Sequence, residues 1–198
     1  YASGFSQLGN LHVDPSDSHL VVTDRGSHSM YKVFDDGSKL RIAGNATTSG
    51  GGDGQSALET GLDEVRGVFF TPDGDYLLAT HDGGQIWYVD TDNLIHLLID
   101  GDKDHTHAGD GLPLSVPGRK ISEPRAVTLA PNGDLLITEN DFGYVRWVPK
   151  LLLGDMDCDG DVDFDDIDDF VLGIQDPQAY ESILGVPPTL KGDTDGDD

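Results

Sequence analysis

The chain has 198 residues, of which 37 are Asp or Glu and 12 are Lys or Arg, and its formal net charge is −25. This length allows one or two domains. The sequence has no basic patch that would attract nucleic acids or anionic membranes, and no apolar run reaches the roughly 18 residues of a membrane span. No signal peptide is recognisable, and the single cysteine, Cys158, excludes an internal disulfide.

The negative charge is unevenly distributed along the chain. Residues 151–198 hold 14 Asp, one Glu and one Lys, a net charge of −14, which leaves −11 of the total −25 for the first 150 residues. A charge asymmetry of this kind marks a domain boundary. We therefore predict two parts, residues 1–149 and residues 150–198.

The first part contains three related segments, which begin at Gly9, Arg66 and Arg125. Each carries a proline at a matching position, and these prolines are separated by 57 and 59 residues: Pro15, Pro72 and Pro131. Internal repeats of this length are typical of stacked or radially arranged supersecondary units. The period therefore predicts a repeat architecture.

Each repeat is predicted to be a four-stranded antiparallel sheet. In the second repeat a short apolar strand precedes a Pro-Asp-Gly turn, and further strands are expected at Tyr76–Thr80, Gln85–Asp90 and Leu94–Ile99. Pro-Asp-Gly and Pro-Asn-Gly supply the positive φ that tight turns require. Four antiparallel strands per repeat make one blade of a β-propeller.

The segments "RGVFFTPDGDYLLAT" and "EPRAVTLAPNGDLLITEN", with the glycine-rich connectors between them, resemble the NHL-type β-propeller, which is related in shape to the gluconolactonase and strictosidine-synthase-like six-bladed proteins. The resemblance covers roughly residues 8 to 149. It implies a mainly β fold, a partial propeller of four-stranded antiparallel blades. It does not imply one function, because such propellers host binding modules and unrelated enzymes.

The number of blades is smaller than a closed propeller needs. The sequence accounts for two full blades and a third that stops after its third strand, whereas closed propellers typically have 4 to 8 blades. Three blades cannot close a ring with their edges covered. Either further blades lie upstream of this chain, which we favour, or strands pair between chains.

Polar residues follow the second strand of each repeat. Asp24, His81 and Glu139 come directly after a threonine at matching positions, and chain direction places Arg66 and Arg125 on the same face. We consider the first three as catalytic or metal-ligating candidates at a channel mouth, and the two arginines as ligands for a small anionic or carbohydrate molecule. The alternative is that these side chains hydrogen-bond connector backbone between blades.

The connector "DGDKDHTHAGD" contains four possible metal ligands: Asp102, Asp104, His105 and His107. It fails the calcium-loop pattern, because counting from Asp100 places His105 where the loop needs glycine and Gly111 where it needs an acid. A transition-metal site through the two histidines and an ordinary solvated loop both remain open. No motif for nucleophilic catalysis occurs.

The acidic segment "GDMDCDGDVDFDD" matches a calcium-binding loop when Asp155 is position 1. Gly160 then falls at position 6, where the loop turns sharply, and Val162 is the apolar anchor at position 8. The expected Ca²⁺ ligands, one of them through its backbone carbonyl, are Asp155, Asp157, Asp159, Asp161, Asp163 and Asp166.

Asp instead of Glu at position 12, followed by a helix, makes this segment resemble a type I dockerin, a small α-helical calcium-loop module that docks onto cohesin domains. An apolar stripe after the loop predicts a helix that ends near Leu172-Gly173, and Asp176-Pro177 predicts a cap and a second helix up to Gly185. A second loop begins at Gly192 and is truncated, with ligands Asp193, Asp195 and Asp197. Phe164 and Asp165 occupy positions where cohesin-contacting Ser or Thr are familiar.

Two functions follow from these patterns. The first is a non-catalytic exported bacterial protein, extracellular or on the cell surface, whose propeller binds a ligand or a protein. Its tail then attaches through Ca²⁺ to a cohesin-like partner, beside polysaccharide degradation as the resemblance implies. The second is a metal-dependent lactonase, lyase or sugar-acid hydrolase of the six-bladed type. The tail is alternatively a brace at the domain junction or a disordered acidic segment.

Overall fold

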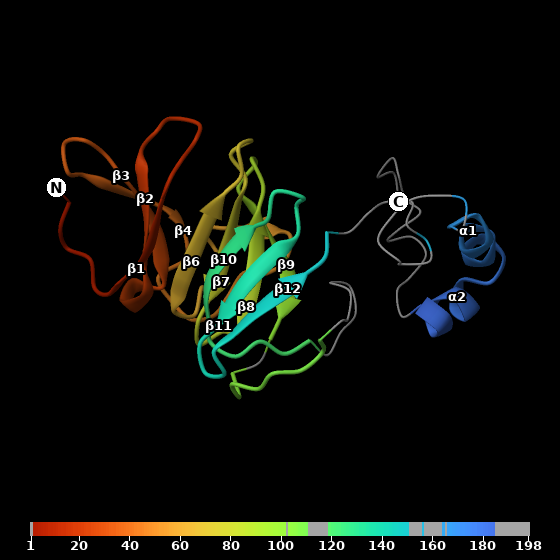
Figure 1. Ribbon diagram of the computed structural model, residues 1–198. Coiled ribbons are helices and arrows are strands. Elements are labelled where there is room, and N and C mark those ends of the chain that lie inside the picture. The colour runs from red at the N-terminus through yellow and green to blue at the C-terminus, as the bar shows by residue number, and fades with distance from the viewer. Residues whose placement is uncertain are drawn as a thin grey trace.

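The computed structural model describes residues 2–101, 103–110, 119–150, 156, 164 and 166–184. These residues form three antiparallel sheets followed by two helices (Figure 1). Each sheet corresponds to one sequence repeat. The predicted mainly β fold and the predicted order, sheets first and helices last, are both found.

The first sheet contains four strands in sequence order and is the first complete blade. A single 3-10 turn, η1 (Arg25–Ser27), separates its second and third strands. The strands are β1 (Leu8–Val13), β2 (Leu20–Asp24), β3 (Ser29–Val33) and β4 (Lys39–Ala43).

The second sheet is the second complete blade, with one additional strand. The two-residue β5 (Gln55–Ser56) lies in the connector between the blades and pairs with the outer edge of β9. The four blade strands are β6 (Val65–Phe70), β7 (Tyr76–Thr80), β8 (Gln85–Val89) and β9 (Leu94–Asp100).

The third sheet has three strands, as the sequence predicts for a blade that stops early. They are β10 (Pro124–Leu129), β11 (Leu135–Glu139) and β12 (Tyr144–Val148). Within the described part of the chain, no fourth strand pairs with β12.

The first turns of the second and third blades confirm the role expected of the Pro-x-Gly segments. Gly74 (φ 99°) and Gly133 (φ 94°) adopt the left-handed conformation that favours glycine. The turn around Gly74 is closed by a hydrogen bond from Thr71 N to Asp75 O of 2.8 Å, and that around Gly133 by one from Ala130 N to Asp134 O of 2.8 Å. These two turns therefore have the same construction.

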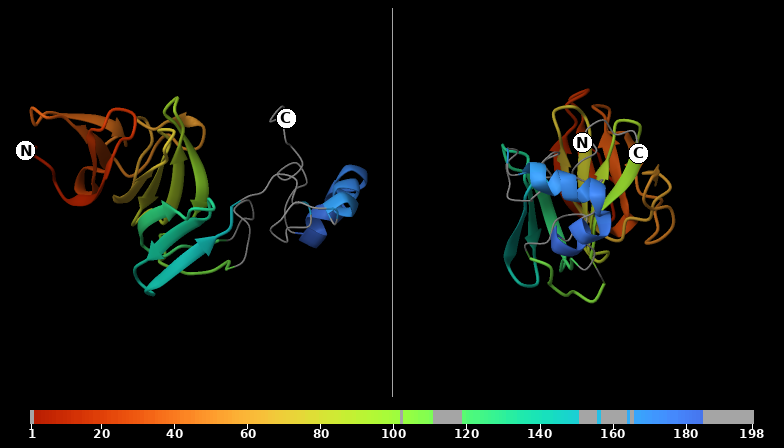
Figure 2. Two further views of the ribbon diagram at one scale, coloured as in Figure 1. Left: turned by 45° about the horizontal axis from the view of Figure 1, so that its top comes forward. Right: turned by 90° about the vertical axis from the view of Figure 1, so that its right-hand side faces the viewer.

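The first strands of the blades lie side by side, with β6 between β1 and β10 (Figures 1 and 2). Their close approach requires small residues. A Cβ placed on Gly67 would lie 2.8 Å from the Cβ of Ala79 and 3.3 Å from the Cα of Ala126. The inner strands therefore pack almost backbone to backbone, as a propeller centre requires.

Two buried clusters hold the sheets together. One joins the first blade to the second and includes Met30, Val65 and Leu78, each fully buried. The other joins the second blade to the third and includes Ile86 and Ile137, also fully buried. The apolar alternation of the strands therefore serves packing between neighbouring blades.

All three inner strands start with a β-bulge. The register shifts between Leu8 and Leu11 in β1, between Val65 and Gly67 in β6, and between Pro124 and Ala126 in β10. The bulged residue of the second blade is therefore Arg66, and that of the third is Arg125. A bulge redirects a side chain at the rim of a sheet.

The two helices are α1 (Asp166–Gln175) and α2 (Pro177–Leu184), and they pack against each other. Asp176 caps α2 by accepting a hydrogen bond of 3.0 Å from Ala179 N, as the Asp-Pro pair predicts. The predicted end of the first helix near Leu172-Gly173 is wrong, since α1 continues to Gln175. Gly173 is buried, so it provides space inside the helix pair and does not end the helix.

Neither helix in the described part of the chain is long and apolar enough to cross a membrane.

The contribution of the buried interface between the first two blades can be measured at Leu78. Replacing this fully buried side chain by alanine is expected to lower the free energy of unfolding by about 2–5 kcal/mol, because the mutation removes apolar contacts and leaves a cavity. Urea denaturation provides the measurement. Leu40→Ala, at a 54% exposed side chain, is the control and should change the free energy by less than about 0.5 kcal/mol. Equal effects of the two variants would contradict the packing described.

Candidate functional site

The bulged ends of the inner strands carry a group of polar side chains that we call the polar cluster. It contains two histidines, four carboxylates and three arginines, which come from all three blades and their connectors: Glu64, His81, Asp82, His105, Glu123, Asp141, Arg25, Arg66 and Arg125.

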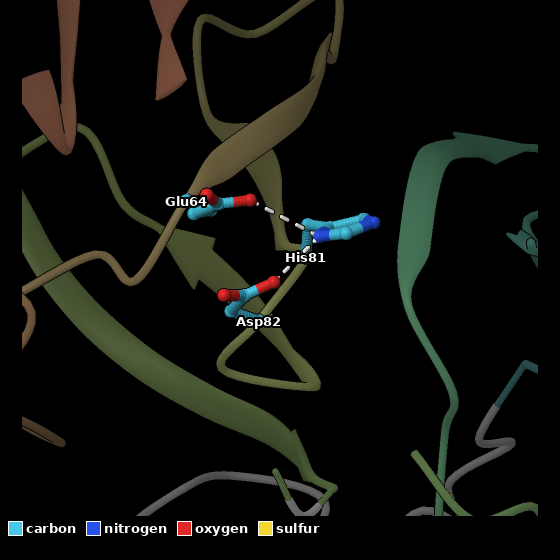
Figure 3. Close-up of side chains that lie close together, drawn as sticks. All are labelled: Glu64, His81 and Asp82. Carbon is cyan, nitrogen blue, oxygen red and sulfur yellow. Dashed lines mark hydrogen bonds and ion pairs between the residues drawn. The ribbon is translucent and has the colours of Figure 1, made fainter. Parts of the chain in front are cut away.

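His81 lies at the centre of the polar cluster and is only 5% exposed. Its Nδ1 is 2.8 Å from Asp82 Oδ1 and 3.2 Å from Glu64 Oε2, so two carboxylates contact the same ring nitrogen (Figure 3). These contacts favour a proton on Nδ1.

The second ring nitrogen of His81 faces Glu123. Nε2 lies 2.9 Å from Glu123 Oε2, yet it is buried and makes no hydrogen bond. Glu123 Oε2 is thus a close electrostatic partner of Nε2, although the contact lacks hydrogen-bond geometry. A buried imidazole nitrogen without a hydrogen-bond partner is unusual outside functional sites.

Glu123 lies between the two histidines of the cluster. While one of its oxygens faces His81, the other is 3.3 Å from Nδ1 of His105, which also lies 3.0 Å from Asp141 Oδ2. Ser122 Oγ donates to the same oxygen of Asp141 at 2.7 Å. The hydrogen bond to Asp141 raises the pKa of His105 despite the partial burial of its ring.

Glu64 and Glu123 occupy equivalent positions, each two residues before a bulged arginine. Both have left-handed backbones, with φ of 54° and 44°, and both carbonyls accept the backbone N–H that follows the second strand. Non-glycine residues in this conformation are uncommon, and they concentrate at functional sites. The folded chain therefore maintains a local strain that positions these two carboxylates.

The three arginines are unequally paired. Arg25 binds Glu64 with two hydrogen bonds, of 2.5 Å and 2.9 Å, whereas Arg66 Nη2 lies 3.8 Å from Glu64 and Arg125 Nη2 lies 3.7 Å from Glu123. Burial would raise the pKa of Glu64, but the pairing with Arg25 outweighs it and lowers that pKa. Burial lowers the pKa of Arg66, as do the two neighbouring guanidinium groups.

Two sets of three side chains in the cluster have the donors and spacing to hold a metal ion. In each set the ligand atoms lie within 4.8 Å of one another: Glu64, His81 and Asp82, and His105, Glu123 and Asp141. One imidazole and two carboxylates suit a divalent ion such as Zn²⁺ or Mn²⁺. The second set fits better, because Arg25 already binds both oxygens of Glu64.

Of the three residues predicted at the channel mouth, only His81 belongs to the polar cluster. Asp24 is buried and accepts hydrogen bonds from Ser6 N (2.9 Å) and Gln7 N (2.8 Å), which fixes the segment before β1. Although burial acts in the opposite direction, these hydrogen bonds lower the pKa of Asp24. The alternative weighed from the sequence, hydrogen bonding to connector backbone, describes Asp24.

Glu139 serves a similar purpose in the third blade. It is 1% exposed, accepts hydrogen bonds from Arg146 Nε (2.7 Å) and Ser122 N (3.1 Å), and lies 2.8 Å from His107 Nδ1. Arg146 also donates to the carbonyls of Ala108 and Lys120. This network fixes the connector to the blade.

The histidines of that connector have different partners. His105 joins the polar cluster, whereas His107 contacts Glu139 and Asp110. The structure therefore does not present the two as ligands of one metal ion. His105 has φ of 54°, so the chain turns between them.

Several members of the cluster were not among the residues predicted from the sequence. The signal was present as a repeated Glu-x-Arg motif, Glu64-Val65-Arg66 and Glu123-Pro124-Arg125, at equivalent repeat positions. Asp82, Asp141 and Arg25 carry no comparable pattern. Their places in the cluster are determined by the paths of the turns after the second strands.

Most of the predicted calcium loop, and all of the truncated second loop, lie outside the described residues. Of the six expected Ca²⁺ ligands, only Asp166 is described. It is buried, and its Oδ1 accepts a hydrogen bond of 2.5 Å from Met156 N. Tyr180 donates to the carbonyl of Met156 at 2.6 Å, so a residue near the start of the loop is bound to both helices.

No family model matches the chain, and no curated protein matches it. Solved structures do. A protein of unknown function from Bacteroides thetaiotaomicron has a TM-score of 0.62 and 19% identity over 74% of this chain and 37% of its own. An auxiliary nutrient binding protein from Bacteroides ovatus has a TM-score of 0.51 and 14% identity over 70% and 37%.

A gluconolactonase from Xanthomonas campestris has a TM-score of 0.50 and 16% identity over 72% of this chain and 38% of its own. At such identities the similarity establishes the propeller-type fold alone, without an NHL or dockerin assignment. This chain spans less than half of the length of these structures. It therefore corresponds to part of a propeller.

The protonation of His107 is expected to make stability depend on pH. Burial would lower its pKa, but hydrogen bonds to Glu139 and Asp110 outweigh this and raise the pKa above the ordinary 6.5. A raised pKa adds stability that is complete below the unfolded pKa and is lost as pH rises through the folded pKa. The melting temperature of the wild type should therefore fall more than that of His107→Gln between about pH 6 and about pH 8. Equal changes in the two proteins would argue against this role.

Proposed function

We propose that the polar cluster is a metal-assisted acid–base site that acts on a small sugar-derived substrate, in the manner of a lactonase, a lyase or a sugar-acid hydrolase. The observation that carries the proposal is the environment of His81. Its Nδ1 contacts two carboxylates, while its buried Nε2 faces Glu123 Oε2 at 2.9 Å. An imidazole with carboxylates at both ring nitrogens is held in one orientation and can exchange a proton with its partners, as acid–base catalysis requires.

In this proposal each part of the cluster has a chemical task. His81 Nε2 accepts a proton from water or from the substrate, and the carboxylates of Asp82 and Glu64 stabilise the resulting imidazolium. His105, Glu123 and Asp141 would hold a divalent cation, which when bound supplies polarisation of a substrate oxygen. The fold shared with a gluconolactonase is compatible with this role, at the level of fold only.

The role of His81 can be tested by assaying the chain with Zn²⁺, Mn²⁺ or Ca²⁺ against a panel of sugar lactones and uronic-acid glycosides. His81→Gln should lower kcat by about 100- to 10,000-fold, because it removes the base while leaving most of the volume in place. The control is His96→Gln, since His96 lies on β9 and pairs with Asp90, outside the cluster. Full activity of His81→Gln, with an unchanged melting temperature, would refute the proposal.

The tail supports a second proposal, calcium-dependent attachment of an exported protein to a cohesin-type partner, with the propeller as a binding platform. Two observations favour it. Asp166 and Tyr180 connect Met156 to both helices, so ion binding in the loop would be coupled to their packing. The helices also expose apolar side chains, as interaction surfaces do: Ile167 51%, Phe170 45%, Val171 42%, Ile174 67% and Ile183 69%.

Calcium binding to the whole chain can be measured by calorimetry, with helix content followed by circular dichroism. Ca²⁺ should increase the helical signal, and removal of the ion by a chelator should reverse the change. Asp166→Asn retains an acceptor for Met156 N but loses the charge, so it should weaken binding by at least about 10-fold. Asp168→Asn, at an exposed position on α1, is the control. A spectrum unchanged by Ca²⁺ would contradict the proposal.

A further inference from the structure

We propose that Arg66, with Arg25 and Arg125, forms a carboxylate-binding subsite, so that the substrate of the polar cluster carries a free carboxylate group. This inference rests on the proposed acid–base function and narrows it. Of the three chemistries considered, it favours a lyase or a hydrolase acting on sugar acids over a lactonase acting on neutral lactones.

The positions of Arg66 and Arg125 contribute nothing to strand pairing. Arg66 and Arg125 are the bulged residues of β6 and β10, so each is an extra residue in the inner strand and has no direct partner in the ladder. The first blade has Gly9 at the aligned position. A Cβ there would lie 2.4 Å from Thr23 Oγ1 and 3.0 Å from Arg66 O, so no side chain fits.

The first blade instead contributes Arg25, from the turn after β2. Its guanidinium group binds both oxygens of Glu64 and thereby neutralises the carboxylate nearest to Arg66. Glu64 makes its two hydrogen bonds with Arg25, so its contact with Arg66, at 3.8 Å, is the weaker of the two. The positive charge of Arg66 is therefore available to an anion from outside the chain.

The donors of Arg66 are the unusual feature of this subsite. Its side chain is only 15% exposed, its Nε is buried without a hydrogen-bond partner, and its Nη2 lies 3.8 Å from the nearest carboxylate oxygen, beyond hydrogen-bond distance. Arg125 is likewise 3.7 Å from Glu123. A buried guanidinium group that lacks hydrogen-bond partners costs free energy, which a bound carboxylate would recover in part by accepting hydrogen bonds from it.

The subsite is connected directly to the proposed base. Glu64 Oε2 lies 3.8 Å from Arg66 Nη2 and 3.2 Å from His81 Nδ1, so one carboxylate separates the arginine from the imidazole. A substrate anchored by its carboxylate at Arg66 would therefore place its adjacent carbons near His81. Neutralisation of the substrate carboxylate by Arg66 would also make the neighbouring C–H bond of the substrate more acidic, which suits proton abstraction at that carbon.

The test is calorimetric binding of D-glucuronate to the full chain after metal removal on a chelating resin, with D-glucose as the neutral match and inorganic phosphate as a general anion. The expected result is saturable glucuronate binding, which Arg66→Gln weakens by about 10- to 100-fold and Arg66→Lys weakens less. Glucose should not bind. The control is Arg41→Gln, on the outer strand β4, which should bind as the wild type does.

Four results would overturn the inference: no glucuronate binding, equal binding of glucose, tighter binding of phosphate than of glucuronate, or unchanged affinity in Arg66→Gln. Failure of the proposed function is a separate result, because binding requires no turnover. His81→Gln should still bind glucuronate, and Arg66-dependent binding together with full turnover by His81→Gln would refute the base and retain the subsite.

Discussion

The close packing of the three inner strands is the constraint on which the rest of the structure depends. Glycine at position 67 and alanine at position 126 let the backbones of β6 and β10 approach to within a distance that a larger side chain would prevent. Because the strands are in contact, their bulged ends are neighbours, and side chains from three blades meet at one face. The packing of the backbones therefore determines which side chains meet in the polar cluster.

The acidic composition has a structural meaning within the propeller part. Asp24 and Glu139 are buried and accept several hydrogen bonds each, and so fix connectors to blades. Asp134 does the same at the end of β12, where it accepts from Trp147 Nε1 at 2.7 Å and from Lys150 N at 2.8 Å. A buried carboxylate is tolerated when donors compensate its charge. The net charge therefore does not measure how many acids are free to bind a ligand.

The sequence predicted the blades well because their signals are local. Strand Tyr76–Thr80, the turns at Gly74 and Gly133 and the unfinished third blade follow from alternation and turn residues. The cluster was predicted only in part, through His81, Arg66 and Arg125. Glu64 and Glu123 could have been noticed through the repeated Glu-x-Arg motif, but the bulge and the left-handed backbone that direct their side chains into the cluster have no signature in one sequence. His105 and His107 have different partners because the chain turns at His105. This turn depends on contacts with residues distant in the chain, which one sequence does not reveal.

The bulges have a consequence for how such a face can change during evolution. A bulged residue contributes little to strand pairing, so its side chain can be exchanged with little effect on the stability of the blade, whereas an exchange in the ladder disturbs its neighbours. The second and third blades thus each offer one position of low structural cost at the same point of the face, whereas Gly9 in the first blade leaves no room for a side chain. Selection can vary these positions one blade at a time, and a single scaffold can in this way acquire new ligand preferences while its core stays unchanged.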